Sequence, residues 1–138
     1  MSTQGFISVP AAIFGLTFVG FGINACIRPL SGLSFFLFDM PSNPADQKMV
    51  EQLMIVYGVR DVYMGIAMLI AVAYGTRKTL GWITIAGSAV AFADGLICAR
   101  YKGGQGAHWG YAPLLTVLGL VMVLGKNPEM VDLGRKRS

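Results

Sequence analysis

Apolar residues along this chain occur in long blocks, without the alternation of a half-buried strand or the narrow stripe of a soluble amphipathic helix. Four blocks stand out, at residues 7–27, 50–74, 79–99 and 108–124. A helix needs roughly 20 mostly apolar residues to cross the hydrocarbon core of a bilayer. Three blocks reach this length and the fourth is the shortest, so the pattern predicts four membrane-spanning helices.

The segments between the blocks predict how these helices are connected. Residues 75–78 form a tight turn, so the second and third helices should be antiparallel neighbours. The longer segment 28–49 contains an apolar run, Leu33 to Phe38, that is too short to cross the membrane. We expect this run to lie at the interface or to re-enter the bundle. Asn43 followed by Pro44 has the pattern of an N-cap and a first helical residue.

Composition agrees with an integral membrane protein. Of 138 residues, 54% are hydrophobic and 13% are charged, and the mean hydropathy is +0.60. A soluble domain usually carries about 25% charged residues. We therefore predict an all-α fold, a four-helix transmembrane bundle that forms one domain over residues 1–138 and ends in a basic tail at 125–138. A soluble protein with an unusually apolar core is the alternative interpretation.

Basic residues predict the orientation of the bundle. With four spans, both termini and the 75–78 turn lie on one side, which carries six of the Lys and Arg residues against four on the other. The positive-inside rule then places the termini in the cytoplasm. If the organism is eukaryotic, we expect the protein in the endoplasmic reticulum membrane. The net charge of +4 does not predict nucleic-acid binding, because no stripe of Lys and Arg is interleaved with aromatic residues.

Cysteine and histidine are scarce. Cys26, Cys98 and His108 are the only residues of these types, and no CxxC motif occurs. We therefore expect no metal site and no cofactor. Both cysteines fall near the same end of their spans, so a disulfide between them is geometrically conceivable.

Three ionisable residues interrupt the apolar blocks. Arg60 and Asp61 lie in the second span and Asp94 lies in the third. Each costs about 2.5–3.5 kcal/mol to insert into a membrane, so such residues face protein or a water-filled cavity and usually pair. Arg60 precedes Tyr74 by 14 residues, and Asp94 follows Thr79 by 15. Both therefore lie roughly 21–22 Å from the turn that joins their helices, and we expect them to meet.

Further polar groups approach the same half of the bundle. We expect Asn24 and Arg28 at the end of the first span to bind a substrate, together with Met64. Tyr57 shares a helical face with the Arg60–Asp61 step, and His108 begins the last span. Two of these residues have a structural alternative: an interhelical hydrogen bond for Asn24 and an interfacial or loop position for His108.

Small residues predict where helices approach closely. Gly58 and Gly65 recur along the second span, and Gly87 and Ala91 along the third. Residues without bulky side chains let helix backbones come together in membranes.

Short motifs carry a resemblance to a known family. Gly58-Val59-Arg60-Asp61 followed by Gly65, then Asp94-Gly95, then a loop with His108, resembles a family of small four-helix membrane proteins. That family is described as a domain of unknown function, occurs in fungi and bacteria, and is distantly similar to DoxX-like proteins. The resemblance spans roughly residues 5–125 and implies a four-helix membrane bundle without implying an activity. In size and topology alone, the chain is also similar to fungal membrane enzymes such as the anthrone oxygenases.

Two functional hypotheses follow. In the first, the protein is an enzyme doing acid–base chemistry on a lipophilic biosynthetic intermediate, of the isomerase, cyclase or cofactor-free oxygenase type. Asp94 is then the acid–base group, Arg60 the anion clamp and Asp61 the orienter of Arg60, with Tyr57 and His108 as auxiliary donors. In the second, it is a non-catalytic assembly, carrier or proton-coupled transport module, and the charged cluster is structural. The expected partners are the bilayer, a lipophilic small molecule and, for transport, further copies of this chain.

Overall fold

The structure is a computed structural model that describes residues 3–101 and 103–125. Its helices are α1 (Thr3–Ile27), α2 (Pro29–Ser34), α3 (Pro44–Tyr74), α4 (Arg77–Tyr101), α5 (Gln105–Trp109) and α6 (Ala112–Leu124). The predicted all-α fold is confirmed, and four helical segments are long and apolar enough to cross a membrane. The last of these runs from Gln105 to Leu124 and is interrupted between α5 and α6.

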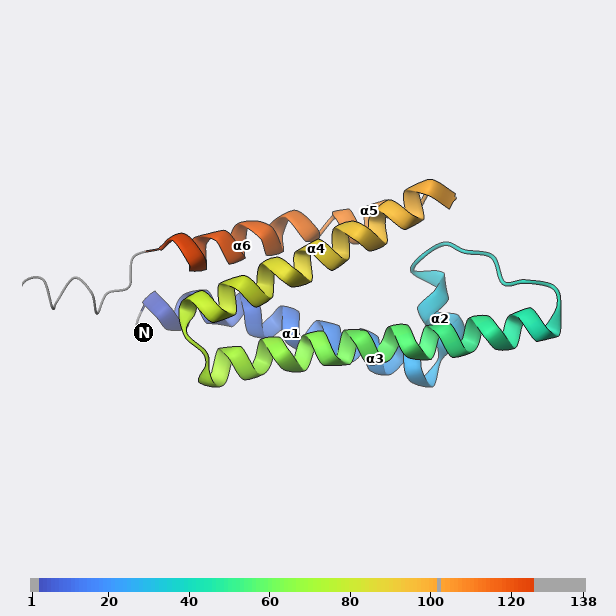
Figure 1. Cartoon of the computed structure of the whole chain (residues 1–138), viewed down its shortest axis with the longest axis horizontal. Helices are drawn as coiled ribbons and strands as arrows, with labels where there is room; N and C mark the ends of the chain where they lie inside the picture. The colour runs from blue at the N-terminus through green and yellow to red at the C-terminus, as the bar shows by residue number, and fades with distance from the viewer. Residues whose placement is uncertain (1–2, 102, 126–138) are drawn as a thin grey trace, which may run out of the picture.

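The four spans are arranged as two antiparallel hairpins joined in tandem. α1 pairs with α3, and α4 pairs with α5 and α6, while the seam between α3 and α4 is looser. The N-terminal end of α1, the turn between α3 and α4, and the end of α6 lie at one end of the molecule (Figure 1). The tightest packing is therefore within each hairpin, although the short turn makes α3 and α4 neighbours as predicted.

Glycines bring α1 and α3 into backbone contact. A Cβ on Gly22 would lie 2.5 Å from the carbonyl oxygen of Gly58, and one on Gly65 would lie 2.5 Å from that of Gly15. The predicted role of Gly58 and Gly65 is confirmed, with α1 as the partner helix. The same prediction for Gly87 is wrong, because the nearest atoms to its Cβ position are side-chain atoms at 3.8 Å or more.

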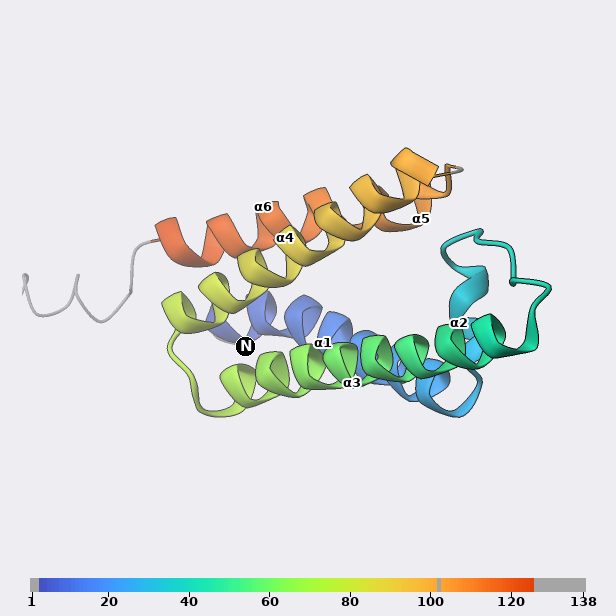
Figure 2. The same cartoon turned by 45° about the vertical axis from the view of Figure 1, so that its right-hand side comes forward.

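The apolar run after α1 folds back into the bundle. α2 and the turn that follows it lie against α1 and α3, at the end of the molecule opposite the start of α1 and the end of α6, as Figure 2 shows. Leu33 and Phe36 are buried there in a cluster that includes Met54 of α3. Asn43 then caps α3 as predicted, because its Oδ1 accepts a hydrogen bond of 3.0 Å from the backbone N–H of Ala45.

The structure also bears on the cysteines and on the C-terminal tail. Cys26 and Cys98 are free thiols, so the conceivable disulfide between them is absent. All but the first residue of the 125–138 tail lies outside the described residues, and the cytoplasmic orientation of the termini stays a prediction.

Candidate functional site

Arg60 and Asp94 join the two hairpins through a two-point ion pair. Nη1 of Arg60 donates to Oδ1 of Asp94 at 3.1 Å, and Nη2 donates to Oδ2 at 2.7 Å. The predicted meeting of these residues at one depth is thus confirmed. Paired, parallel hydrogen bonds between guanidinium and carboxylate are among the stronger polar contacts in proteins. This contact therefore fixes α3 against α4 along their otherwise loose seam.

Asp61 shares the same guanidinium through longer contacts. Nε and Nη2 of Arg60 lie 3.4 and 3.3 Å from Oδ1 of Asp61. Both carboxylates are buried, with Asp61 5% and Asp94 7% exposed, whereas the Arg60 side chain is 37% exposed. The guanidinium carbon also lies 4.2 Å from the ring centroid of Tyr57. One cation is thus shared by two acids, and it lies closer to Asp94.

A cavity of about 190 Å³ lies beside Asp61, between α1, the α2 segment, α3 and the α5–α6 end. Its wall is mostly apolar and aromatic. Asp61 is the one charged side chain on it, apart from His108 if that residue is protonated. The remaining lining residues are Phe14, Thr17, Phe18, Phe21, Ala25, Gly32, Phe35, Phe36, Tyr57, Ala107 and Tyr111.

Ring contacts connect the polar residues of the cavity wall. The ring of Phe36 lies 4.9 Å from that of Tyr57 and 5.0 Å from that of His108, between centroids. His108 in turn lies 6.5 Å from Tyr111. Phe36, in the segment that folds back after α1, therefore bridges the rings of α3 and α5, and His108 continues the row of rings to Tyr111.

Two glycines set the position of His108. Gly103 and Gly104 have φ angles of 94° and 88°, in the left-handed region that favours glycine. The chain can therefore turn sharply after α4, and α5 runs back along it. His108 is 4% exposed as a result, and its Nδ1 lies 3.9 Å from Sγ of the buried Cys98.

The rim of the cavity lies on the outer surface of the bundle. Thr17 is exposed, and Phe21 and Phe35 are 45% and 43% exposed. These residues lie on α1 and directly after α2, where an integral membrane protein contacts lipid. These exposed lining residues thus place one edge of the cavity at the protein surface.

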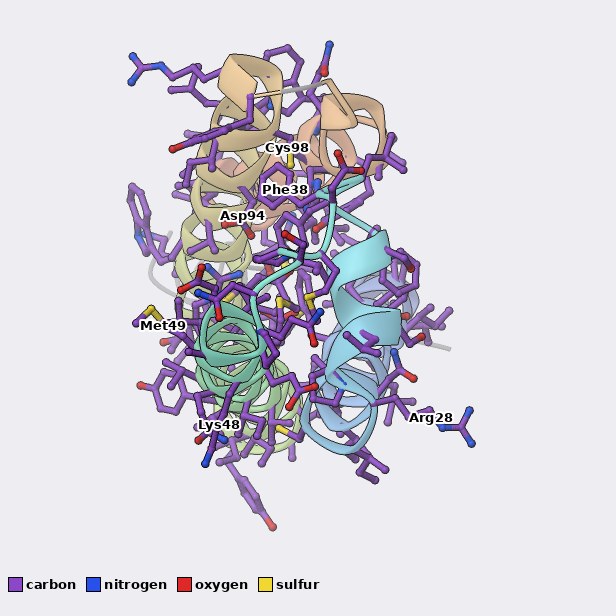
Figure 3. All side chains as sticks on the ribbon, turned by 90° about the vertical axis from the view of Figure 1, so that its right-hand side faces the viewer. Arg28, Phe38, Lys48, Met49, Asp94 and Cys98 are labelled. Carbon is purple, nitrogen blue, oxygen red and sulfur yellow. The ribbon has the colours of Figure 1, made fainter. Side chains whose placement is uncertain are left out.

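The other predicted site residues do not line this cavity. Nδ2 of Asn24 donates to Oγ of Ser31 at 3.2 Å, which matches its structural alternative. Arg28 is exposed and points away from the bundle (Figure 3). Met64 lines a separate groove of about 210 Å³ between α3 and α4. Asp94 and Arg60 lie next to Asp61 but are not part of the cavity wall.

Several residues that line the cavity were not predicted from the sequence. Phe18, Phe36 and Tyr111 are apolar or aromatic members of apolar runs, and nothing in their spacing distinguishes them from lipid-facing residues. The one available signal was the run from Leu33 to Phe38, which is too short to span a membrane and therefore had to pack elsewhere.

The described residues contain no group of three or more His, Cys, Asp or Glu side chains that could hold a metal ion. The wall instead offers a carboxylate, an imidazole and the hydroxyl groups of Tyr57 and Tyr111. These groups exchange protons or donate and accept hydrogen bonds. The arrangement is chemically equipped to bind a small lipophilic molecule by one polar group.

Comparison with known proteins gives a family and no further relative. A family model described as a domain of unknown function (DUF4267) matches residues 15–122. None of the curated proteins and none of the solved structures matches the chain. The matched range includes Arg60, Asp61, Asp94 and His108, whereas the expected fungal and bacterial occurrence and the DoxX-like similarity stay predictions.

Proposed function

The chain belongs to this DUF4267 family, and we propose from its own site that it is a membrane enzyme of the isomerase or cyclase type. Its substrate would be a lipophilic small molecule, such as a biosynthetic intermediate, and its reaction would proceed by proton transfer. The observation that carries the proposal is the position of Asp61, a buried carboxylate on the wall of an apolar cavity.

Asp61 is the better candidate for the acid–base role that the sequence first suggested for Asp94. Both oxygens of Asp94 accept hydrogen bonds from Arg60, whereas Arg60 donates only to Oδ1 of Asp61. Asp61 also lines the cavity and Asp94 does not. An acid–base group has to reach the proton that it transfers, so contact with the cavity decides between the two.

His108 would carry the second proton. It lies on the α5 side of the cavity, across from α3, which carries Asp61. Removing a proton at one position of a substrate and returning it at another requires two such groups or one mobile one. Tyr57 and Tyr111 would orient the substrate through their hydroxyl groups, and Arg60 would hold Asp61 in place.

The substrate would enter from the bilayer. The rim formed by Thr17, Phe21 and Phe35 is exposed and would face lipid in a membrane-embedded bundle. A lipophilic molecule concentrates in the membrane, so a lateral opening gives it a short path to the cavity. A wall this apolar also excludes water from the reacting groups, which strengthens electrostatic interactions with the substrate.

The second candidate is a non-catalytic carrier or assembly module. It is favoured by one observation, the two-point contact between Arg60 and Asp94 that links the hairpins. In that case the charged cluster would hold the helices in register, and the cavity would bind its ligand without changing it.

Solvent deuterium uptake tests the enzyme proposal. The protein in nanodiscs is incubated in D₂O with a lipophilic extract of the source organism, and products are followed by mass spectrometry. We expect new or deuterated compounds with the wild type, and their loss with Asp61→Asn. Asp46→Asn, which changes an exposed acid in the first turn of the same helix, is the matched control. A wild-type protein that changes no compound in the extract would count against the proposal and favour the carrier.

A further inference from the structure

The charged cluster carries more negative than positive charge. Asp61 and Asp94 are both buried, and Arg60 is the one Lys or Arg that contacts them among the described residues. Isolated charge in a low-dielectric interior is costly unless it is paired. With both acids ionised, the cluster lacks one positive charge.

Of the two acids, Asp61 is the one whose negative charge is less well compensated, and it lies on the cavity side of the cluster. Nη1 and Nη2 of Arg60 approach Asp94 to 3.1 and 2.7 Å, while its nearest approach to Asp61 is 3.3 Å. Strong charge-assisted N–H···O bonds are about 2.7–2.9 Å long, so Asp61 has the weaker share of the guanidinium. A cation entering the cavity would meet this carboxylate first.

The aromatic wall suits a cation as well. The lining includes the rings of five phenylalanines and two tyrosines. The face of an aromatic ring is negative in charge distribution, and cations within about 6 Å of a ring centroid are attracted to it. Proteins recognise organic ammonium groups with such aromatic cages. No Lys or Arg side chain lines this cavity, and Arg60, which contacts Asp61 from behind the wall, makes its shorter contacts to Asp94.

We propose that the cavity binds a lipophilic molecule through a protonated amine, which donates a hydrogen bond to Asp61 while the aromatic rings surround the organic part. This inference rests on the proposed function for its site and names the chemical class of the substrate. Asp61 would then exchange its proton with the ammonium group, and His108 would transfer the second proton, as in the proposed function.

The cavity limits the size of this amine. An apolar cavity of about 150 Å³ accepts one benzene molecule. The cavity beside Asp61 measures about 190 Å³ and therefore takes one aromatic ring with a short arm. Larger substrates would leave their remaining part at the exposed rim, in lipid.

Two matched probes test the inference. 2-Phenylethylamine carries an ammonium group where n-propylbenzene carries a methyl group, and the two molecules are otherwise similar in shape. Binding to the full-length protein in nanodiscs of zwitterionic lipid is measured by isothermal titration, with empty nanodiscs subtracted. We expect saturable binding of the amine, at least about tenfold tighter than n-propylbenzene, as a charge-assisted hydrogen bond predicts. Equal affinities of the wild-type protein for the two probes, or tighter binding of the hydrocarbon, would overturn the inference.

Variants of Asp61 locate the effect. Asp61→Asn should weaken amine binding at least about tenfold and leave n-propylbenzene within about twofold, whereas Asp46→Asn should change neither. Asp61→Glu keeps the charge and should keep the preference for the amine. An amine preference that survives Asp61→Asn in folded protein would also overturn the inference.

The two proposals fail separately. Amine binding through Asp61 without any deuterium uptake in the extract would leave the inference standing and refute the enzyme. Deuterium uptake into neutral compounds, with no preference for the amine probe, would support the enzyme and overturn the amine inference.

Discussion

Asp94→Asn should destabilise the bundle more than Asp61→Asn, although both substitutions remove a buried carboxylate. Asp94→Asn removes the negative charge and one of the two acceptors that link α3 to α4 at 3.1 and 2.7 Å, and turns an NH2 group toward the Arg60 guanidinium. Asp61→Asn instead leaves Arg60 paired with Asp94 through both of these shorter contacts.

The structure sets the size of the difference. Removing one partner of a buried ion pair costs about 3–5 kcal/mol. The Arg60 side chain is 37% exposed and keeps Asp61 as a neighbour, so we expect about 2 kcal/mol for Asp94→Asn. Asp61→Asn should cost about 1 kcal/mol or less, because the stronger contact survives. For a chain of this length, 1 kcal/mol corresponds to a shift in Tm of about 3–5 °C.

Thermal unfolding in a single detergent, followed by circular dichroism, measures both variants against the wild type. Asp94→Asn should lower Tm by about 6–10 °C, and Asp61→Asn by no more than about 5 °C. Asp46→Asn, at an exposed position in the first turn of α3, should lower Tm by no more than about 1–2 °C, because it removes only a small helix-dipole interaction. Equal losses for the two buried acids, or a larger loss for Asp61→Asn, would refute the unequal sharing of Arg60.

The remaining predictions concern packing and thiol accessibility. Gly58→Ala should cost about 1–3 kcal/mol in the same assay, because its Cβ would lie 2.5 Å from the carbonyl oxygen of Gly22. Gly20→Ala is the control: its Cβ would meet nothing within 4 Å, so it should not destabilise the protein and should gain up to about 1 kcal/mol of helix propensity. Cys98 is 0% exposed and should react with a maleimide far more slowly than the half-buried Cys26, as mass spectrometry will measure; equal rates would contradict the packing around α5.

The sequence was sufficient to predict the spans and the charged cluster. A stretch of some 20 apolar residues has few stable arrangements other than a spanning helix, and a buried charge must find a partner. Helix rise then placed Arg60 and Asp94 at one depth without any knowledge of the packing. Asn43 and Pro44 predicted the start of α3 for a similarly local reason.

The sequence could not predict which groups border the cavity. Asp61 and Asp94 are the same residue type at the same depth, and only the rotation of α3 and α4 decides which one meets the space beside α1. That rotation depends on backbone contacts such as the one between Gly22 and Gly58, which are set by shape and leave no periodic signal. The aromatic lining escaped for a related reason, since lipid-facing and cavity-facing phenylalanines look alike along the chain.

The tandem arrangement of two hairpins has a consequence for how the protein is made. The first hairpin, formed by α1 and α3, carries Arg60 together with Asp61, so it enters the bilayer with its charges already paired. The second hairpin brings Asp94, which forms no ion pair with a Lys or Arg among the described residues of that hairpin, at an insertion cost of about 2.5–3.5 kcal/mol. This cost is relieved when α4 meets Arg60. During biogenesis the first hairpin should therefore insert first, and the second hairpin should become stable in the membrane when it packs against the first.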